Sequence, residues 1–140
     1  MDSYYRLFIS HAWKYGDEYD RLVGLLNSAP RFRWLNWSAS EDKPVIPEGM
    51  IAPNQIVLDA IARKISMADC VLVVAGMYAN HSDWMQAELD ICLRLNKPLI
   101  GIKPWGSERM PQQVSSRTIE DVSWSTDSII AAIQKRCSAR

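Results

Sequence analysis

The chain has 140 residues, of which 48% are hydrophobic, enough for one domain with a buried core. We therefore expect a single domain over residues 1–140. Sixteen basic and sixteen acidic side chains cancel, so the overall charge gives no reason to expect nucleic acid or a membrane as a partner. No stretch approaches the roughly 20 apolar residues of a membrane-spanning helix, and the N-terminus does not resemble a signal peptide. These features predict a cytoplasmic protein.

The predicted elements alternate between strands and helices along the chain. Apolar or branched runs predict strands at residues 4–10, 32–37, 70–76, 98–103 and 119–124. Helical periodicity predicts four helices. Their apolar stripes are Leu22, Val23 and Leu26; Leu58, Ile61, Ile65 and Ala68; Met85, Leu89, Cys92 and Leu93; and Ile129, Ile130, Ile133 and Cys137. Residues 38–53 contain three of the seven prolines and Gly49, which predicts a long loop of the kind that is often functional.

This alternation predicts the α/β class, with about five parallel strands and helices on both faces of the sheet. In such sheets the ligand crevice lies beyond the carboxyl ends of the strands. Residues 10–13, 38–53, 76–82 and 103–106 follow these ends in the predicted arrangement. We therefore expect the functional site among these segments.

The three cysteines, Cys70, Cys92 and Cys137, lie far apart in segments that otherwise predict buried strand or helix. Their odd number and their spacing are not typical of a disulfide framework or of a zinc site. We expect three small core residues in a reducing compartment. His11 and His81 have no third metal ligand at a recognisable spacing, so no metal site is predicted.

Several enzyme classes are disfavoured by missing motifs. The glycine-rich loops that bind dinucleotides or nucleoside triphosphates are absent, which disfavours hydride and phosphoryl transfer. Ser10, His11 and Asp17 are not a convincing hydrolase triad, because neighbours at a strand end point in divergent directions and no nucleophile elbow is present.

Glu88 is the most unusual residue of the predicted helix at 81–95, for which His81 to Asp83 would supply the turn and cap. Its neighbours one turn away are apolar (Trp84, Met85, Ile91 and Cys92), whereas Asp90 has Arg94 at the spacing of an ordinary surface ion pair. A partly desolvated carboxylate needs hydrogen-bond donors or a cationic ligand to stay ionised. Two hypotheses remain open at this point: Glu88 faces a ligand in the crevice, or it pairs with a distant arginine.

Three segments, "YRLFISHAWKYGDEYDRLVGLL", "CVLVVAG" and "SDWMQAELD", resemble the conserved boxes of Toll/interleukin-1 receptor (TIR) domains in order and spacing. They resemble most closely the bacterial TIR-like proteins of Thoeris anti-phage defence. The resemblance extends over about residues 4–105. It implies a flavodoxin-like, three-layer fold, and it implies cleavage of the bond between nicotinamide and ribose in NAD, with Glu88 at the position of the catalytic glutamate.

The same resemblance implies further roles. Phe8, Ser10 and His11 would line the pocket, and Trp84 would lie beside the nicotinamide ribose. Asp42 belongs to the segment that gates the pocket and mediates self-association in TIR domains, and it is a further candidate contact to the substrate. NAD would be a substrate, with no tightly bound cofactor. The product, a cyclic or conjugated ADP-ribose derivative, would activate a separate effector, and a phage protein would be the trigger.

Two alternatives use the same residues differently. A TIR-type interaction module would use the fold as a scaffold without catalysis, and Glu88 would then have a structural partner. A nucleoside deoxyribosyltransferase has a related fold and also places a glutamate against a ribose, but the "FISHAW" turn favours the TIR-like family.

Overall fold

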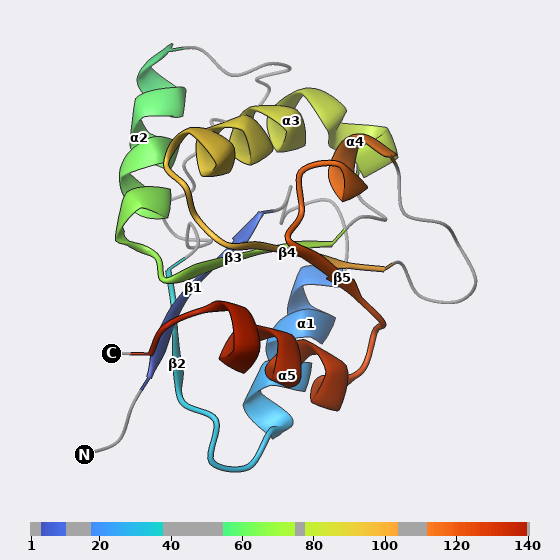
Figure 1. The fold of residues 1–140 in the computed structure, drawn as a ribbon. Helices are drawn as coiled ribbons and strands as arrows, with labels where there is room; N and C mark the ends of the chain where they lie inside the picture. The colour runs from blue at the N-terminus through green and yellow to red at the C-terminus, as the bar shows by residue number, and fades with distance from the viewer. Residues whose placement is uncertain (1–3, 11–17, 38–54, 75–77, 104–111, 140) are drawn as a thin grey trace.

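The computed structural model describes residues 4–10, 18–37, 55–74, 78–103 and 112–139, with the backbone alone at residues 10, 18, 19, 57, 78–85, 112 and 113. Within these residues it contains a five-stranded parallel sheet in the order β2-β1-β3-β4-β5 (Figure 1). The strands are β1 (Tyr5–Ser10), β2 (Trp34–Asn36), β3 (Cys70–Val74), β4 (Leu99–Ile102) and β5 (Glu120–Val122). The predicted α/β class and the predicted parallel sheet of about five strands are confirmed.

The helices are α1 (Glu18–Ser28), α2 (Gln55–Met67), α3 (Tyr78–Arg94), α4 (Gln112–Ser115) and α5 (Thr126–Arg136). The short α4 was not predicted. Helix α3 begins at Tyr78, so the expectation that His81 to Asp83 form a turn and cap was wrong. No glycine or proline occurs in residues 77–97, and nothing in that stretch therefore stops the helix from starting earlier. Over the described residues, none of the helices has the length and apolar character needed to cross a membrane.

The helices divide between the two faces of the sheet, which gives the predicted three layers (Figure 1). Helices α2, α3 and α4 cover one face, called here the α3 face, and α1 and α5 cover the other, called here the α5 face. Strands β3 and β4 are buried at every position, as expected for central strands of a sheet that is covered on both sides. Successive side chains of a strand point to opposite faces, so each strand contributes to both cores.

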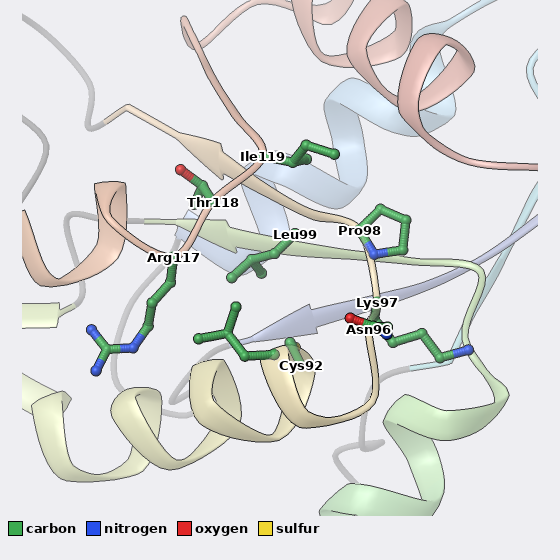
Figure 2. Close-up of a pocket in the computed structure, with 9 residues that line it drawn as sticks. Cys92, Asn96, Lys97, Pro98, Leu99, Arg117, Thr118 and Ile119 are labelled. Atoms are coloured by element: carbon green, nitrogen blue, oxygen red, sulfur yellow. The ribbon is translucent and has the colours of Figure 1, made fainter.

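The α3 face has a recess of about 270 Å³ at the amino end of β4 (Figure 2). It lies between the last turn of α3 and the turn that joins α4 to β5. The recess is lined by Cys92, Leu93, Asn96, Lys97, Pro98, Leu99, Arg117, Thr118 and Ile119. This edge of the sheet is opposite to the carboxyl ends of the strands.

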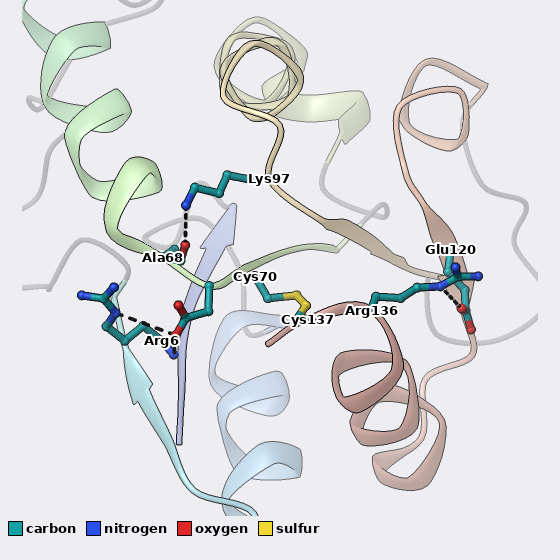
Figure 3. The surroundings of a disulfide bond; sticks show 8 residues. Arg6, Ala68, Cys70, Lys97, Glu120, Arg136 and Cys137 are labelled. Atoms are coloured by element: carbon teal, nitrogen blue, oxygen red, sulfur yellow. Dashed lines mark hydrogen bonds and ion pairs between the residues drawn. A yellow bond between two sulfur atoms is a disulfide. The ribbon is translucent and has the colours of Figure 1, made fainter. Parts of the chain in front are cut away.

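On the α5 face, Cys70 at the start of β3 and Cys137 after α5 form a disulfide (Figure 3). Their Cα atoms are 5.8 Å apart, within the usual range for such a bond. The expectation of three reduced core cysteines was therefore wrong for this pair, although Cys92 is a free, buried thiol as expected. The two cysteines are 67 positions apart in the sequence, which gave no sign of the pairing; the pairing results from β3 and the end of α5 meeting across the core.

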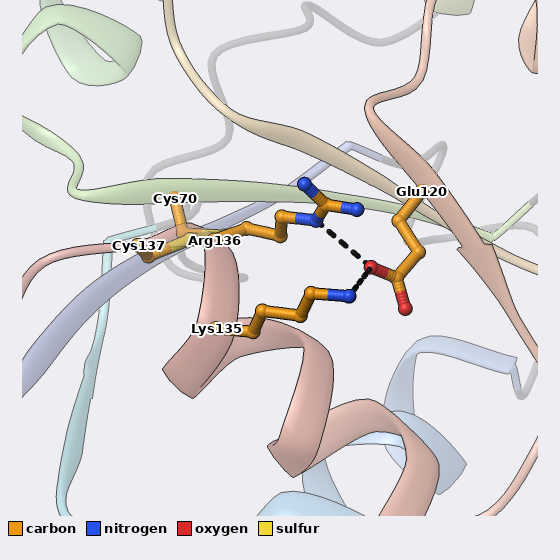
Figure 4. Close-up of polar contacts among 5 residues, drawn as sticks. All are labelled: Cys70, Glu120, Lys135, Arg136 and Cys137. Atoms are coloured by element: carbon orange, nitrogen blue, oxygen red, sulfur yellow. Dashed lines mark hydrogen bonds and ion pairs between the residues drawn. A yellow bond between two sulfur atoms is a disulfide. The ribbon is translucent and has the colours of Figure 1, made fainter.

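The end of α5 is also fixed by charge (Figure 4). The Nε atom of Arg136 donates to Oε1 of Glu120 at 2.8 Å, and Nζ of Lys135 lies 3.9 Å from the same oxygen. At the other end, the Ser125 hydroxyl accepts a hydrogen bond from the backbone N–H of Ser128, so it caps the first turn. Both ends of α5 are thus held in place by side chains.

The predicted helix faces are mostly confirmed, with Leu22, Leu26, Ile61, Ile65, Ala68, Leu89, Cys92, Ile129, Ile133 and Cys137 all buried. The prediction that Leu93 is buried was wrong. Leu93 is 53% exposed, and Ile91 is buried instead. Asp90 was also assigned to the wrong partner. Its Oδ1 accepts from Nε of Arg117 at 3.0 Å, so the ion pair joins α3 to the turn before β5 rather than to Arg94.

Candidate functional site

Glu88 lies in the third turn of α3, on the side of the helix that packs toward the sheet. It is 3% exposed. Among the described residues, the other buried side chains are apolar, so Glu88 is a charged group inside an apolar core. The next residue, Leu89, is fully buried, and Cys92 follows one turn later in the same core. Because a buried carboxylate has lost most of its hydration, it costs free energy and calls for a functional explanation.

Phe8 lies on the same face of the sheet as Glu88. Arg6, two residues earlier in β1, contacts the Trp37 ring near α2 on the α3 face, and strand alternation places Phe8 on the side of Arg6. Phe8 is buried, and α3 packs against β1. The structure thus brings Phe8 and Glu88 into one layer, as a shared site requires.

The other candidate residues are described less fully. Ser10 is the last residue of β1, where its backbone pairs with that of Val73. Trp84 lies in α3, one helical turn before Glu88. His11 and Asp42 lie outside the described residues, as do most of the segments expected to form the crevice.

The Cys92 thiol reports on the electrostatics around Glu88. Burial raises its pKa strongly, and the negative charge of Glu88 raises it further, whereas a backbone hydrogen bond and Lys97 lower it. The thiol therefore stays protonated at neutral pH, which excludes it as a nucleophile. The sequence already placed Cys92 one helical turn after Glu88, and the structure adds that the thiol is buried.

A cation–aromatic cluster at the edge of the α3 face was missed by sequence analysis. The Arg6 Cζ atom lies 5.3 Å from the centre of the Trp37 ring, and Lys64 Nζ lies 5.8 Å from it. Arg6 is also tied to Asp69, whose Oδ2 accepts from the Arg6 backbone N–H at 2.8 Å (Figure 3). The cluster holds α2 and β2 against β1. Its sequence signal was a charged residue, Arg6, and an aromatic residue, Trp37, in two of the predicted strands.

Metal chemistry has no support within the described part of the chain, where no three histidine, cysteine or acidic side chains are grouped as metal ligands. The chemistry that the described residues offer is that of a carboxylate in an apolar, water-poor setting. Such a group can hydrogen-bond sugar hydroxyls and stabilise positive charge that develops nearby.

Comparison with solved structures identifies a similar fold in the CMP N-glycosidase BcmB of Clostridium botulinum. The two chains share 12% sequence identity, with 93% of this chain and 98% of that chain covered and a TM-score of 0.51. At this identity the likeness shows the fold alone. No curated protein matches the chain.

A family model described as "Thoeris protein ThsB, TIR-like domain" matches residues 8–109, which is well over half of the 140 residues. The matched region contains the end of β1 and all of β3 and α3, and so includes Phe8 and Glu88. The resemblance inferred from the three sequence segments is thereby confirmed, and the chain belongs to the Thoeris ThsB TIR-like domain family.

Proposed function

We propose that this chain cleaves the bond between nicotinamide and ribose in NAD, with Glu88 as the catalytic carboxylate. The burial of Glu88 at 3% exposure, on the helix that packs against β1, is the observation that carries the proposal. Membership of a TIR-like family supports it, as does the N-glycosidase named for the structural neighbour of similar fold.

The chemistry suits a single buried carboxylate. Nicotinamide leaves as a neutral molecule from a positively charged ring, so no general acid is needed to expel it. The ribose develops oxocarbenium character, which a carboxylate stabilises through its negative charge and through hydrogen bonds to the ribose hydroxyls. Because the surroundings of Glu88 are apolar, this attraction is less screened than it would be in water. The cationic substrate would also favour the ionised form of Glu88.

The remaining parts of the proposal concern the pocket and its context. Phe8, Ser10, His11, Asp42 and Trp84 would contact NAD, which acts as substrate rather than as a resident cofactor. The product would be an ADP-ribose derivative, cyclic or conjugated, that activates a separate effector in anti-phage defence. We place the reaction in the cytoplasm, with self-association of the chain and a phage protein as trigger.

The test is incubation of the purified chain with NAD, with and without a phage structural protein, followed by separation of nicotinamide and nucleotide products. Glu88→Gln keeps the shape of the side chain and should lower the rate at least about 100-fold. The matched control is Asp90→Asn, the same chemical change on the exposed side of the same helix. A Glu88→Gln variant that keeps full activity would remove Glu88 from the mechanism.

The structural neighbour suggests a second candidate, hydrolysis of the glycosidic bond of a nucleoside monophosphate. CMP and deoxynucleosides therefore belong in the same assay as competing substrates. Release of free cytosine that depends on Glu88, without turnover of NAD, would favour this candidate. If no substrate is turned over in any state of assembly, the non-catalytic interaction module becomes the better interpretation.

A further inference from the structure

The recess on the α3 face is separate from the proposed catalytic site. It opens at the amino end of β4, where Pro98 and Leu99 enter the sheet (Figure 2), whereas the crevice of an open α/β sheet lies at the carboxyl ends. The last turn of α3 forms one wall, through Cys92 and Leu93. An occupant would therefore contact the helix that carries Glu88, about one turn further toward its C-terminal end.

Exposed apolar side chains extend the recess outward. Leu93 on α3 is 53% exposed and Ile119 before β5 is 50% exposed, and both line the opening. Pro98 and Leu99 continue the apolar surface inward. A recess with apolar side chains inside it and at its opening is suited to receive one large hydrophobic side chain together with the backbone on either side of it.

The charged side chains that line the recess are both cationic. Lys97 donates from Nζ to the backbone oxygen of Ala68 at 2.9 Å (Figure 3), and Arg117 donates from Nε to Asp90 at 3.0 Å. These contacts hold both cations at the rim with little freedom. Two basic residues and one acidic residue leave this group with a net charge of +1, so it attracts an acidic partner.

Other occupants fit these features less well. A second copy related by two-fold symmetry would place the same cationic rim against itself, which is unfavourable. The volume of about 270 Å³ is below the roughly 300 Å³ at which small-molecule sites begin, and such a ligand would leave Leu93 and Ile119 uncovered. Nucleic-acid binders have an extended basic surface. This recess is small, and the chain has a net charge of zero.

We propose that this recess docks an acidic polypeptide segment of a partner protein, with one large apolar side chain inserted between Leu93 and Ile119. Acidic residues on either side of that anchor would face Lys97 and Arg117. The site is independent of the NAD reaction, because none of its lining residues belongs to the proposed catalytic group.

The experiment uses the full chain and fluorescently labelled synthetic peptides. One short peptide has a central Phe flanked by Asp and Glu; a second replaces the acidic residues by Lys, and a third replaces Phe by Ala. We expect saturable binding of the first peptide, about tenfold tighter than either of the others, and weaker at high salt. Leu93→Ser and Ile119→Ser should each weaken it about tenfold. Ile56→Ser is the matched control, since Ile56 is 79% exposed on α2 and lies outside the recess.

Leu93, Ile119 and Ile56 are all exposed, so their substitution leaves the core intact, and circular dichroism verifies the fold. Equal binding of the acidic and basic peptides, or an equal loss with Ile56→Ser, would overturn the proposal. So would a dimer in sedimentation equilibrium that Leu93→Ser dissociates, because a second copy would then be the occupant. Glu88→Gln should bind the acidic peptide like the wild type, which distinguishes failure of this proposal from failure of the proposed function.

Discussion

The two faces of the sheet are built from similar apolar residues, yet their polar groups differ in kind. On the α5 face, polar and covalent contacts lock elements together: the Cys70–Cys137 disulfide, the ion pairs of Glu120 and the cap at Ser125. On the α3 face, the Trp37 cluster and the Asp90–Arg117 ion pair also join elements, but a carboxylate is buried at Glu88 and a recess remains open beside the last turn of the same helix.

This difference suggests that one face of the sheet mainly stabilises the fold, while the other carries the features proposed for function. Burial of a charged carboxylate lowers stability, and so does exposure of apolar side chains at a recess. A chain of 140 residues has only a small net free energy of unfolding, so such costs matter. We infer that the tightly fixed α5 face compensates for the polar and open features of the α3 face. The predictions below test this contrast.

The largest expected effect is that of the disulfide on the α5 face. Reduction should lower the free energy of unfolding by about 4 kcal/mol, the loop-entropy estimate for two cysteines that are 67 positions apart. The measurement is urea unfolding with and without reductant. Cys137→Ser should be as unstable as the reduced wild type and should no longer respond to reductant.

Cys92→Ala is the matched control, because Cys92 is the free thiol. It should keep the full response to reductant. Thiol counting provides an independent measurement: the protein denatured without reductant should show one reactive thiol. Three reactive thiols would mean that the α5 face is not covalently closed, and the contrast between the faces would lose its main support.

Much of this architecture could be predicted because its signals are local. The apolar run at residues 70–74 and the alternation of strands with helices are properties of the sequence alone, and they were enough for the fold class. Glu88 could also be singled out from the sequence. The residues three and four positions away from it on the helix are apolar, so none of them could form an ion pair with it. The family resemblance then assigned it a chemical role.

The remaining features depend on tertiary neighbours that periodicity does not reveal. Leu93 was expected in the core, but α3 ends beside the recess and leaves it exposed. Asp90 was assigned to Arg94, whereas Arg117 approaches from a different element. The disulfide was missed because cysteine spacing along the chain does not encode which strand and helix meet. The roles assigned to the candidate site residues all stay predictions, and His11 and Asp42 also lie outside the described residues.

On the α3 face, Cys92 should make the fold less stable at alkaline pH. The pKa of Cys92 is raised in the folded state by burial and by Glu88, whereas in the unfolded chain it is near its ordinary value of about 8.5. Above that pH the unfolded chain loses the thiol proton and the folded chain keeps it. The folded state then binds more protons, so the free energy of unfolding decreases as pH rises.

Between about pH 9 and pH 10, this loss should approach 1.4 kcal/mol, the value of one proton per pH unit. The measurement is urea unfolding of the wild type and of Cys92→Ala over this range. Although the alanine variant is less stable throughout, its stability should fall less steeply. Parallel curves for the two proteins would show that Cys92 ionises equally in both states, and the apolar surroundings inferred around Glu88 would then be wrong.

The smallest expected effect compares one ion pair from each face. Glu120 and Arg136 are joined at 2.8 Å, with both side chains about 30% exposed, while Asp90 and Arg117 are joined at 3.0 Å, with Asp90 55% exposed. Partly exposed pairs typically contribute about 0.2–1 kcal/mol. Because solvent screens the Asp90 carboxylate more, we expect the coupling free energy from double-mutant cycles to be larger for Glu120–Arg136. A larger coupling for Asp90–Arg117 at the same salt concentration would mean that the recess side of α3 is held as firmly as the end of α5. The disulfide would then be the main contact that distinguishes the α5 face from the α3 face.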